Sequence, residues 1–413
     1  MPEDLAVIFA YHFLPENTIG AVRPFRFYKY LSRSGYRCHV ISAADVTQLP
    51  GIDAAYIPDP FITKPREGAG WQLERLLRRF LLPGVTGTQW AVRAYRAAAE
   101  LIEQNPQYRV TLFSTFPPVG SHLPAYWLAR RKKLPWIADF RDPLAGNLDY
   151  AGIGRFPSYL YERLEAILVR AADFVIANTD AAQEKLRRSY PDRADRIQLI
   201  WNGFDPEERL PPLPVMPAGR KVISHVGELY GGRSVSPILQ SLRRLIDNRQ
   251  LSKSEFQIYL AGPLVEDSVP DPAFMAQAEQ EGWVKLERNR MPRNEAHRVI
   301  QSSHALLLVQ PQTSIQVPGK LFEYLQTGRP ILAFVPADSP VERILRKSGV
   351  PYQCIYPSED PQQLDQSMLR FFRINGAEAQ PSEWFETEFN ARGHAEKVGD
   401  LIQLANRERA VMK

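Results

Sequence analysis

The sequence predicts an α/β fold made of two Rossmann-like, doubly wound domains that face each other across a cleft. Short β-rich apolar runs alternate with helical patterns along the chain, which is typical of parallel sheets covered by helices. Residues 210–217 interrupt this alternation with four prolines in eight residues, the composition of a stiff linker. The length of 413 residues also exceeds what one core supports and suits two domains of about 200 residues.

The first half has the pattern of one doubly wound domain. A predicted helix at residues 20–33 follows the first apolar run, and polar, glycine or proline residues follow most of the other runs. The predicted strands are residues 5–10, 36–41, 110–113, 136–140 and 174–177. Ligands of such folds bind at the carboxyl ends of the strands, so we expect functional residues in the loops that follow them.

The second half repeats the pattern after the proline-rich segment. Its predicted strands are residues 221–226, 256–261, 283–286, 305–309 and 330–335, and its predicted helices are residues 237–248, 293–303 and 320–327. We therefore expect a first domain at 1–208, a linker at 209–219, a second domain at 220–383 and a terminal segment at 384–413. Chemistry is expected in the cleft between the two domains.

Composition narrows the class of protein. The chain is 44% hydrophobic and 23% charged, as in ordinary globular proteins, and its two cysteines, Cys38 and Cys354, are too few for a disulfide framework. A reducing compartment is expected. The sequence shows no signal segment and no apolar run of the roughly 18 residues that span a membrane. We expect a cytoplasmic protein, with attachment to the inner face of a membrane as the alternative.

The net charge of +5 lies entirely in the first half. Residues 1–205 hold 26 basic and 21 acidic side chains, whereas the remainder holds 25 of each. This excess suggests an anionic surface or acceptor on the first domain, although five charges are also within ordinary variation. The sequence has no basic run interleaved with aromatic residues, so nucleic acid is not an expected partner.

Two segments of the first half have the pattern of helices with one apolar and one basic face. Residues 71–82 place Trp71 and several leucines beside three arginines, and residues 90–99 add Arg93 and Arg96. Such helices can lie in a bilayer interface and are attracted to anionic lipids. The sequence therefore predicts an anionic membrane surface as a partner, unless these arginines simply cover the outer faces of packed helices.

The strongest candidate for a binding site is the segment at residues 316–330. Pro318 and Gly319 open a predicted helix whose free amides suit an anion such as a diphosphate, and Lys320 adds a positive charge. Glu323, one turn further along, is placed to accept hydrogen bonds from two adjacent ribose hydroxyls. The alternative is an ordinary amphipathic helix with an exposed lysine and glutamate.

A second candidate is the glycine-rich turn that follows the first strand of the second half. Glycines allow a backbone to approach a phosphate closely, and an arginine can form a bidentate pair with it. The residues of this turn are Gly227, Tyr230, Gly231, Gly232 and Arg233. The alternative is a glycine-rich turn with a surface arginine.

Together with further motifs, these residues resemble the GT-B-fold glycosyltransferases of group 1, the family 4-like enzymes of bacterial polysaccharide and glycolipid synthesis. The resemblance covers nearly the whole chain. The segment at 318–330 resembles the family's P-x-K-L-F-E-Y-L-A-x-G-R-P motif, and the loop with Gly20 resembles its glycine-containing first loop. Further similar segments are residues 135–143, close to D-F-R-D-P-W but with Leu144 in place of tryptophan, residues 172–179, and residues 200–205, close to P-N-G-x-D.

The resemblance implies a hexosyltransferase-like enzyme that moves a sugar from a nucleotide-diphosphate sugar to a hydroxyl acceptor, which is a glycan, a lipid-linked sugar or another alcohol. It implies an acceptor-binding first domain, a nucleotide-binding second domain and a terminal helix near 384–406 that crosses back to the first domain. It also implies retaining chemistry without a metal or other cofactor, in agreement with the absence of an Asp-x-Asp motif from the sequence.

Two positions depart from the family pattern. Ile315 stands where the wider family has the first of two glutamates, and Glu228 stands where it has a phosphate-binding arginine, so that Arg233 falls at the family's lysine position. An apolar residue at 315 is expected to alter recognition of the donor sugar. Glu228 would repel a diphosphate unless it points away, and Lys320 is then expected to supply the missing charge.

Two aspartates near the end of one predicted strand are candidates for catalysis. Asp142, just past the strand, is the first candidate for acceptor activation or sugar binding, and Asp139 is the second. The alternative for both is a structural role in an ion pair or a loop cap. Two other functions stay open: a nucleotide-sugar 2-epimerase, for which the sequence offers no identifiable acid/base pair, and a non-catalytic nucleotide-sugar-binding protein.

Overall fold

The structure is a computed structural model that describes residues 3–16, 19–44, 46, 48–59, 87–146, 155–208, 219–265, 268–374 and 379–411. The chain divides into two compact units, Met1–Asp205 with Ala391–Lys413, and Pro206–Asn390. The chain thus passes between the units after Asp205 and again after Asn390, whereas the sequence placed these boundaries at 208 and 383. All but one residue of the expected linker at 209–219 lie outside the described residues.

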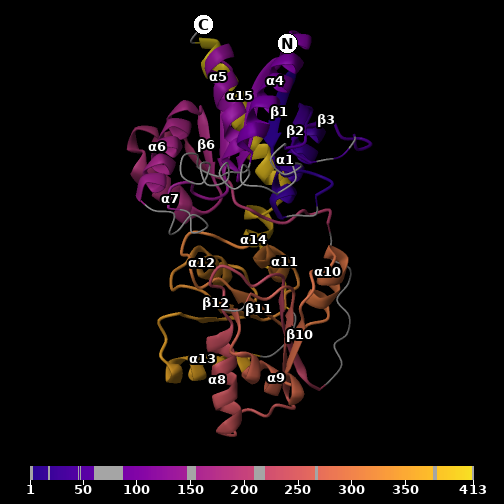
Figure 1. The fold of residues 1–413 in the computed structure, drawn as a ribbon, viewed down its shortest axis with the longest axis vertical. Helices are drawn as coiled ribbons and strands as arrows, with labels where there is room; N and C mark the ends of the chain where they lie inside the picture. The colour runs from indigo at the N-terminus through magenta and orange to yellow at the C-terminus, as the bar shows by residue number, and fades with distance from the viewer. Residues whose placement is uncertain are drawn as a thin grey trace, which may run out of the picture. The chain divides into compact units, whose positions relative to one another are not determined.

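The first unit contains a seven-stranded parallel sheet with the strand order β3-β2-β1-β4-β5-β6-β7 (Figure 1). Nearly every residue of its four central strands is buried, as expected for a parallel sheet covered on both faces. The strands are β1 (Asp4–Ala10), β2 (Arg37–Ser42), β3 (Ala54–Tyr56), β4 (Arg109–Phe116), β5 (Trp136–Phe140), β6 (Phe174–Ala177) and β7 (Ile197–Leu199).

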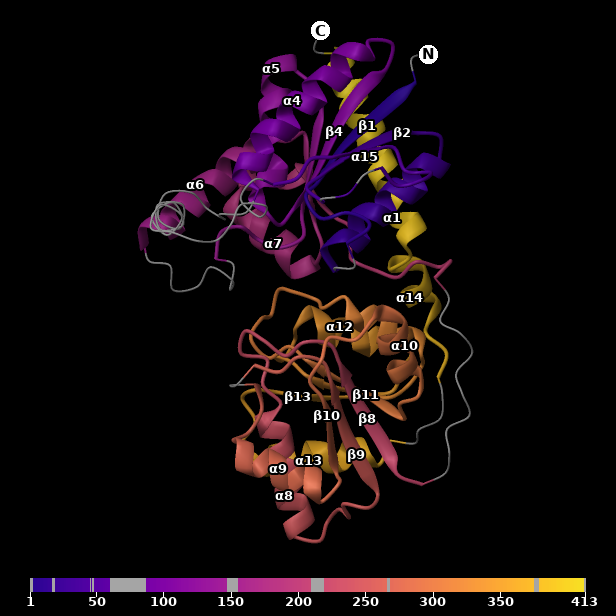
Figure 2. The ribbon, with the colours of Figure 1, turned by 45° about the vertical axis from the view of Figure 1, so that its right-hand side comes forward.

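Helices cover both faces of this sheet. Alternate residues of β1, Ala6 and Ile8, pack with α1 and α15 in one core, and these two helices lie side by side (Figure 2). On the opposite face α5 packs against β1, β4 and β5. The helices are α1 (Ile19–Arg33), α4 (Thr88–Gln104), α5 (His122–Lys132), α6 (Arg155–Ala171), α7 (Asp180–Ser189) and α15 (Ala391–Val411), with 3₁₀ turns η1 (Val119–Ser121) and η3 (Pro191–Arg196).

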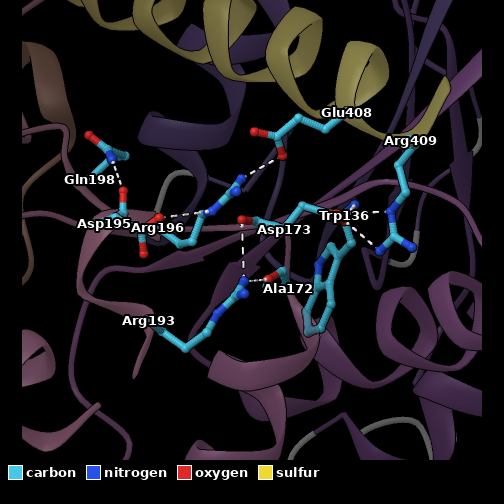
Figure 3. Close-up of polar contacts among 9 residues, drawn as sticks. All are labelled: Trp136, Ala172, Asp173, Arg193, Asp195, Arg196, Gln198, Glu408 and Arg409. Atoms are coloured by element: carbon cyan, nitrogen blue, oxygen red, sulfur yellow. Dashed lines mark hydrogen bonds and ion pairs between the residues drawn. The ribbon is translucent and has the colours of Figure 1, made fainter. Parts of the chain in front are cut away.

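The end of α15 is fixed to the sheet by ion pairs (Figure 3). Arg409 donates two hydrogen bonds to the carboxylate of Asp173, at 2.9 and 3.1 Å, and Asp173 also accepts the backbone N–H of Trp136 at 2.9 Å. Glu408 pairs with Arg196 at 2.5 Å. The terminal segment of the chain is therefore an integral part of the first unit.

The expected terminal helix near 384–406 is two separate helices. The first, α14 (Glu383–Glu388), belongs to the second unit, where the ring of Phe389 lies 5.1 Å from that of Phe322. Only α15, from Ala391, packs in the first unit. The predicted continuous helix is thus wrong at Trp384, because burial of the Phe385 and Phe389 rings keeps this segment on the second unit.

The second unit contains a six-stranded parallel sheet with the order β10-β9-β8-β11-β12-β13. Its strands are β8 (Lys221–Val226), β9 (Phe256–Ala261), β10 (Val284–Glu287), β11 (Ala305–Val309), β12 (Ile331–Phe334) and β13 (Tyr352–Ile355). Its helices, besides α14, are α8 (Ser236–Asp247), α9 (Pro272–Gln280), α10 (Arg293–Gln301), α11 (Lys320–Gln326), α12 (Pro340–Lys347) and α13 (Pro361–Phe372). Both units are doubly wound and Rossmann-like, so the predicted fold class is confirmed. In the described part of the chain, no helix is long and apolar enough to cross a membrane.

Candidate donor site and first-domain loops

The candidate donor site begins where β8 ends. Gly227 has a φ of 110°, in the left-handed region that favours glycine. A Cβ atom on Gly227 would lie 3.0 Å from the ammonium nitrogen of Lys320, and one on Gly262 would lie 2.6 Å from the carbonyl oxygen of Gly227. Glycine is therefore needed at both positions, because the backbone after β8 passes closely between Lys320 and the end of β9.

The side chain of Lys320 lies under this turn. Its Nζ is 3.2 Å from Nε2 of His225, a buried residue of β8. Burial, and then the charge of Arg233, lower the pKa of Lys320 from its ordinary value to about 7, while Glu323 opposes the shift. The site thus holds a lysine whose positive charge is poorly compensated and which an anionic ligand would stabilise.

The turn beyond Gly227 presents a second cation. The backbone N–H of Arg233 donates to the carbonyl of Tyr230 at 3.1 Å, and the two glycines between them, Gly231 and Gly232, both have positive φ. The guanidinium of Arg233 lies over the ring of Tyr230, 4.4 Å from its centroid. The glycines therefore form a tight turn that holds the arginine and tyrosine together.

Glu323 lies in the first turn of α11, close to α10. Its Oε1 is 3.8 Å from the guanidinium of Arg293 and 3.7 Å from Nε2 of His297, and 29% of its side chain is exposed. Arg293 also pairs with Glu208 at 2.9 Å. The carboxylate is thus oriented by α10 and keeps an accessible side.

Helix α11 is tied to β8 by a buried tyrosine. The backbone N–H of Val226 donates to the hydroxyl of Tyr324 at 3.1 Å. The carbonyls of Pro318 and Gly319 accept the first N–H groups of the helix, from Leu321 and Phe322. The contact between Tyr324 and Val226 fixes α11, and with it Lys320 and Glu323, against the end of β8.

The two departures from the family motif have different surroundings. Glu228 pairs with Arg290, with its carboxylate oxygen 3.0 Å from the guanidinium. The backbone N–H of Ile315 donates to the hydroxyl of Thr313 at 3.1 Å. Glu228 is thus neutralised by a neighbouring side chain, which reduces the repulsion of a diphosphate expected from the sequence.

In the first unit, Asp139 is buried at the centre of a polar network. Its two carboxylate oxygens accept hydrogen bonds from Arg23 at 2.9 and 3.0 Å, and one also accepts from Thr115 at 2.8 Å. Arg23 in turn donates to the carbonyls of Ile200 and Trp201. Asp139 therefore links β5 to α1 and to the segment before Asn202.

The loop after β5 carries Asp142, which is half-buried. The preceding residue, Arg141, donates to the carbonyl of Gly20 at 2.6 Å, so the loop is joined to the start of α1. Buried Glu165 accepts hydrogen bonds from the backbone N–H groups of Leu144 and Ala145, both at 2.8 Å. The position of Asp142 is thus fixed from both sides of the loop.

The structure brings the second-unit candidates together around the end of β8, and it places Gly20, Asp139 and Asp142 at the carboxyl edge of the first sheet. Sequence reasoning missed His225, Gly262, Tyr324 and Arg290. A polar residue inside an otherwise apolar strand was the available signal for His225. In the described part of the chain, no group of three His, Cys, Asp or Glu side chains is placed to hold a metal ion.

Comparison with known proteins agrees with these observations. The family described as "Glycosyl transferase 4-like domain" matches residues 17–203. No curated protein matches the chain in sequence. Among solved structures, HepE from Anabaena, crystallised with UDP and glucose, is 14% identical, with a TM-score of 0.62 over 97% of this chain and 99% of that one.

Two further structures are similar. WaaG, a glycosyltransferase involved in lipopolysaccharide biosynthesis, is 16% identical, with a TM-score of 0.59 over 96% of this chain and 99% of that one. The trehalose 6-phosphate synthase of Burkholderia multivorans is 14% identical, with a TM-score of 0.63 over 100% of this chain and 99% of that one. At such identities the likeness shows the fold, which is the two-domain GT-B fold.

A GT-B fold with a glycosyl transferase 4-like domain at residues 17–203 defines the class: this is a glycosyltransferase. The match of residues 17–203 to the glycosyl transferase 4-like domain agrees with the resemblance carried by the motifs of the chain to the group 1, family 4-like glycosyltransferases.

Proposed function

We propose that this glycosyltransferase takes its sugar from a nucleotide-diphosphate sugar and passes it to a hydroxyl acceptor. The observation that carries the proposal is the gathering of Lys320, Arg233 and Glu323 around the end of β8. Two cations beside a glycine turn suit a diphosphate, and a part-exposed carboxylate suits the hydroxyls of a ribose. The complex of HepE with UDP and glucose supports this class of donor.

The chemistry we propose needs no metal. As the bond from the sugar to the diphosphate breaks, negative charge grows on the leaving group, and Lys320 and Arg233 are placed to stabilise it. In retaining transfer the acceptor hydroxyl attacks from the side of the leaving group, whose phosphate oxygen can accept the proton. Asp142 is then proposed to bind or activate the acceptor, with Asp139 holding the surrounding loops through Arg23.

The test is incubation of the purified protein with UDP-, GDP- and ADP-hexoses, with and without excess EDTA. We expect slow hydrolysis of one donor, at the same rate with and without EDTA. Turnover of that donor should be faster when an acceptor is added. Release of a sugar epimerised at C2 would instead identify a nucleotide-sugar 2-epimerase. Binding without turnover would identify a non-catalytic nucleotide-sugar-binding protein, and loss of all activity in EDTA would overturn the metal-free chemistry.

The acceptor is proposed to be lipid-linked and to be met at an anionic membrane surface. The predicted helix at 71–82 lies outside the described residues, but α4 and α5 expose Arg93, Arg96, Arg130 and Arg131. Residues of these two helices line a hollow of about 660 Å³, formed by Tyr95, Tyr126, Trp127, Arg130 and Arg131. Aromatic and basic side chains together suit the interface of an anionic bilayer.

A flotation assay tests this surface. The wild type should float with vesicles containing phosphatidylglycerol, stay behind with neutral vesicles, and be released by about 0.5 M salt because screening is then nearly complete. Replacing Arg130 and Arg131 with glutamate should abolish flotation. The same charge change at the exposed Arg163 and Arg188, on α6 and α7, is the matched control. A wild type that never floats with anionic vesicles would favour a soluble acceptor.

A further inference from the structure

His225 is a buried titratable residue to which the proposed chemistry assigns no part. It lies in β8, two residues before Gly227, with 1% of its surface exposed. Its Nδ1 is 3.0 Å from the carbonyl oxygen of Leu307 in β11. A carbonyl can only accept, so Nδ1 carries the proton, and Nε2 of the neutral ring presents a lone pair.

That lone pair faces Lys320. The Nζ of Lys320 lies 3.2 Å from Nε2 and therefore donates one of its N–H bonds to the imidazole. Burial, followed by the charge of Lys320, lowers the pKa of His225 well below its ordinary value, so the ring stays neutral beside the ammonium. The absence of a side chain at Gly227 leaves room for Nζ on the other side.

We infer that His225 is a positioning residue: its neutral imidazole holds the Lys320 ammonium at the end of β8, with the remaining N–H bonds available to the donor diphosphate. The inference rests on the proposed function for the identity of that ligand. The contacts from Nδ1 to Leu307 and from Nε2 to Lys320 make the imidazole a rigid bridge between β11 and α11.

Two further groups act on the titration of Lys320. Arg233, from the turn after β8, disfavours the ammonium, and Glu323, from α11, favours it. Neither of these two is altered when His225 is replaced, so a change in the titration of Lys320 reports on the imidazole.

Two substitutions separate the two contacts of the ring. In His225→Asn the side-chain amide can replace Nδ1 and keep the bond to Leu307, but it has no acceptor at the place of Nε2. In His225→Gln the side-chain oxygen can reach the place of Nε2 and accept from Lys320. If the role of His225 is purely structural, the asparagine variant should behave like the wild type. If His225 positions Lys320, the glutamine variant should behave like the wild type instead.

The first measurement is the pKa of Lys320 in the free protein, from the pH dependence of its acetylation by trace acetic anhydride, followed by mass spectrometry. Asparagine should lower this pKa by about 1, because the ammonium loses a hydrogen-bond acceptor, and glutamine should leave it near the wild-type value. An unchanged pKa in the asparagine variant, with native thermal stability, would overturn the inference whether or not a nucleotide binds.

The second measurement is calorimetry with UDP, GDP and ADP. The nucleotide that binds the wild type should bind the asparagine variant about tenfold more weakly at pH 7, and the difference should narrow at pH 5.5, where Lys320 is protonated in both proteins. Equal affinities at pH 7 would also overturn the inference. If none of the three binds the wild type, the proposed donor fails instead, and the acetylation result still decides whether His225 holds Lys320.

Discussion

Two charged side chains, the buried Asp139 and the partly buried Lys320, have opposite electrostatic surroundings. Asp139 has a bidentate arginine and a threonine hydroxyl on its oxygens. Lys320 instead donates to a neutral imidazole, and burial lowers its pKa to about 7. A charge that is fully compensated stabilises structure, whereas a poorly compensated one suits a binding site. On this argument Asp139 organises the first unit, and Lys320 is the residue that meets the anionic ligand.

The low pKa of Lys320 predicts a pH dependence of nucleotide binding. A diphosphate favours the ammonium, so above pH 7 binding must take up a proton, and affinity should fall by up to about tenfold for each pH unit. Calorimetry from pH 6.5 to 9 measures the slope. Lys320→Met should flatten it, and Arg233→Ala should move the fall to higher pH because Arg233 lowers the pKa of Lys320. The exposed Lys285→Met is the control; an equally steep slope in Lys320→Met would contradict the assignment.

Glu323 is predicted to bind the donor ribose. Replacing it with alanine should weaken nucleotide binding by about 2 kcal/mol, the size of a lost charge-assisted hydrogen-bond pair. Folding should change little, because 29% of the side chain is exposed. Glu295→Ala, on the exposed side of α10, serves as the control in the same calorimetry. Unchanged affinity in Glu323→Ala would refute this role.

At the residue scale, the sequence predicted those donor-site residues that lie within short, recognisable motifs. The glycines, Arg233, Lys320 and Glu323 form short segments whose residue types already indicate phosphate and ribose binding. The partners of these residues come from other elements: Arg290 reaches Glu228 across 62 positions, and His225 reaches Lys320 across 95. Such contacts depend on the register of parallel strands, which one sequence does not reveal.

At the scale of elements, helix α6 holds the loop that carries Asp142 through one buried side chain. Glu165 of α6 accepts two backbone N–H groups from the loop that carries Asp142 and a hydrogen bond from the hydroxyl of Tyr190 at 3.0 Å. Burial raises the pKa of Glu165, while these three bonds favour the carboxylate. The loop is thus held by one buried acceptor.

Glu165→Ala should therefore cost about 2–3 kcal/mol of unfolding free energy, because two buried donors and one part-buried donor lose their acceptor. Urea unfolding measures this cost. If Asp142 contacts the acceptor, the variant should also lose transfer to the acceptor more than it loses nucleotide binding. Glu162→Ala, one turn earlier and exposed, is the control. A transfer rate equal to that of the wild type would show that the position of this loop does not matter to the reaction.

Strands were more predictable than the elements around them. β5, β8, β9 and β11 match their predicted bounds because central strands of a parallel sheet are continuous apolar runs between polar residues. The short edge strands β3, β7 and β13 were missed, since three or four residues carry too little pattern. The terminal helix was predicted as continuous because only Phe389 and Asn390 separate α14 from α15, and neither glycine nor proline marks the break.

At the scale of the whole molecule, the two chain crossings leave the first unit at one place. The backbone N–H of Ala391 donates to the carbonyl of Phe204 at 3.0 Å, directly before Asp205. The buried carboxylate of Asp205 accepts from Lys29 at 2.8 Å and from Tyr30 at 2.5 Å, and Arg392 lies over the ring of Tyr30. Both connections are therefore fixed to the same part of α1.

Two adjacent, well-anchored crossings are the arrangement expected of a hinge, because a rotation there changes the backbone direction at only two places in the chain. We predict that donor binding moves the two units closer together and that the radius of gyration from small-angle scattering falls when the nucleotide is added. Lys320→Ala, which should not bind the nucleotide tightly, is expected to give the same curve with and without it. Identical curves for the wild type in both states would contradict this prediction, because they would show that the protein does not close on its donor.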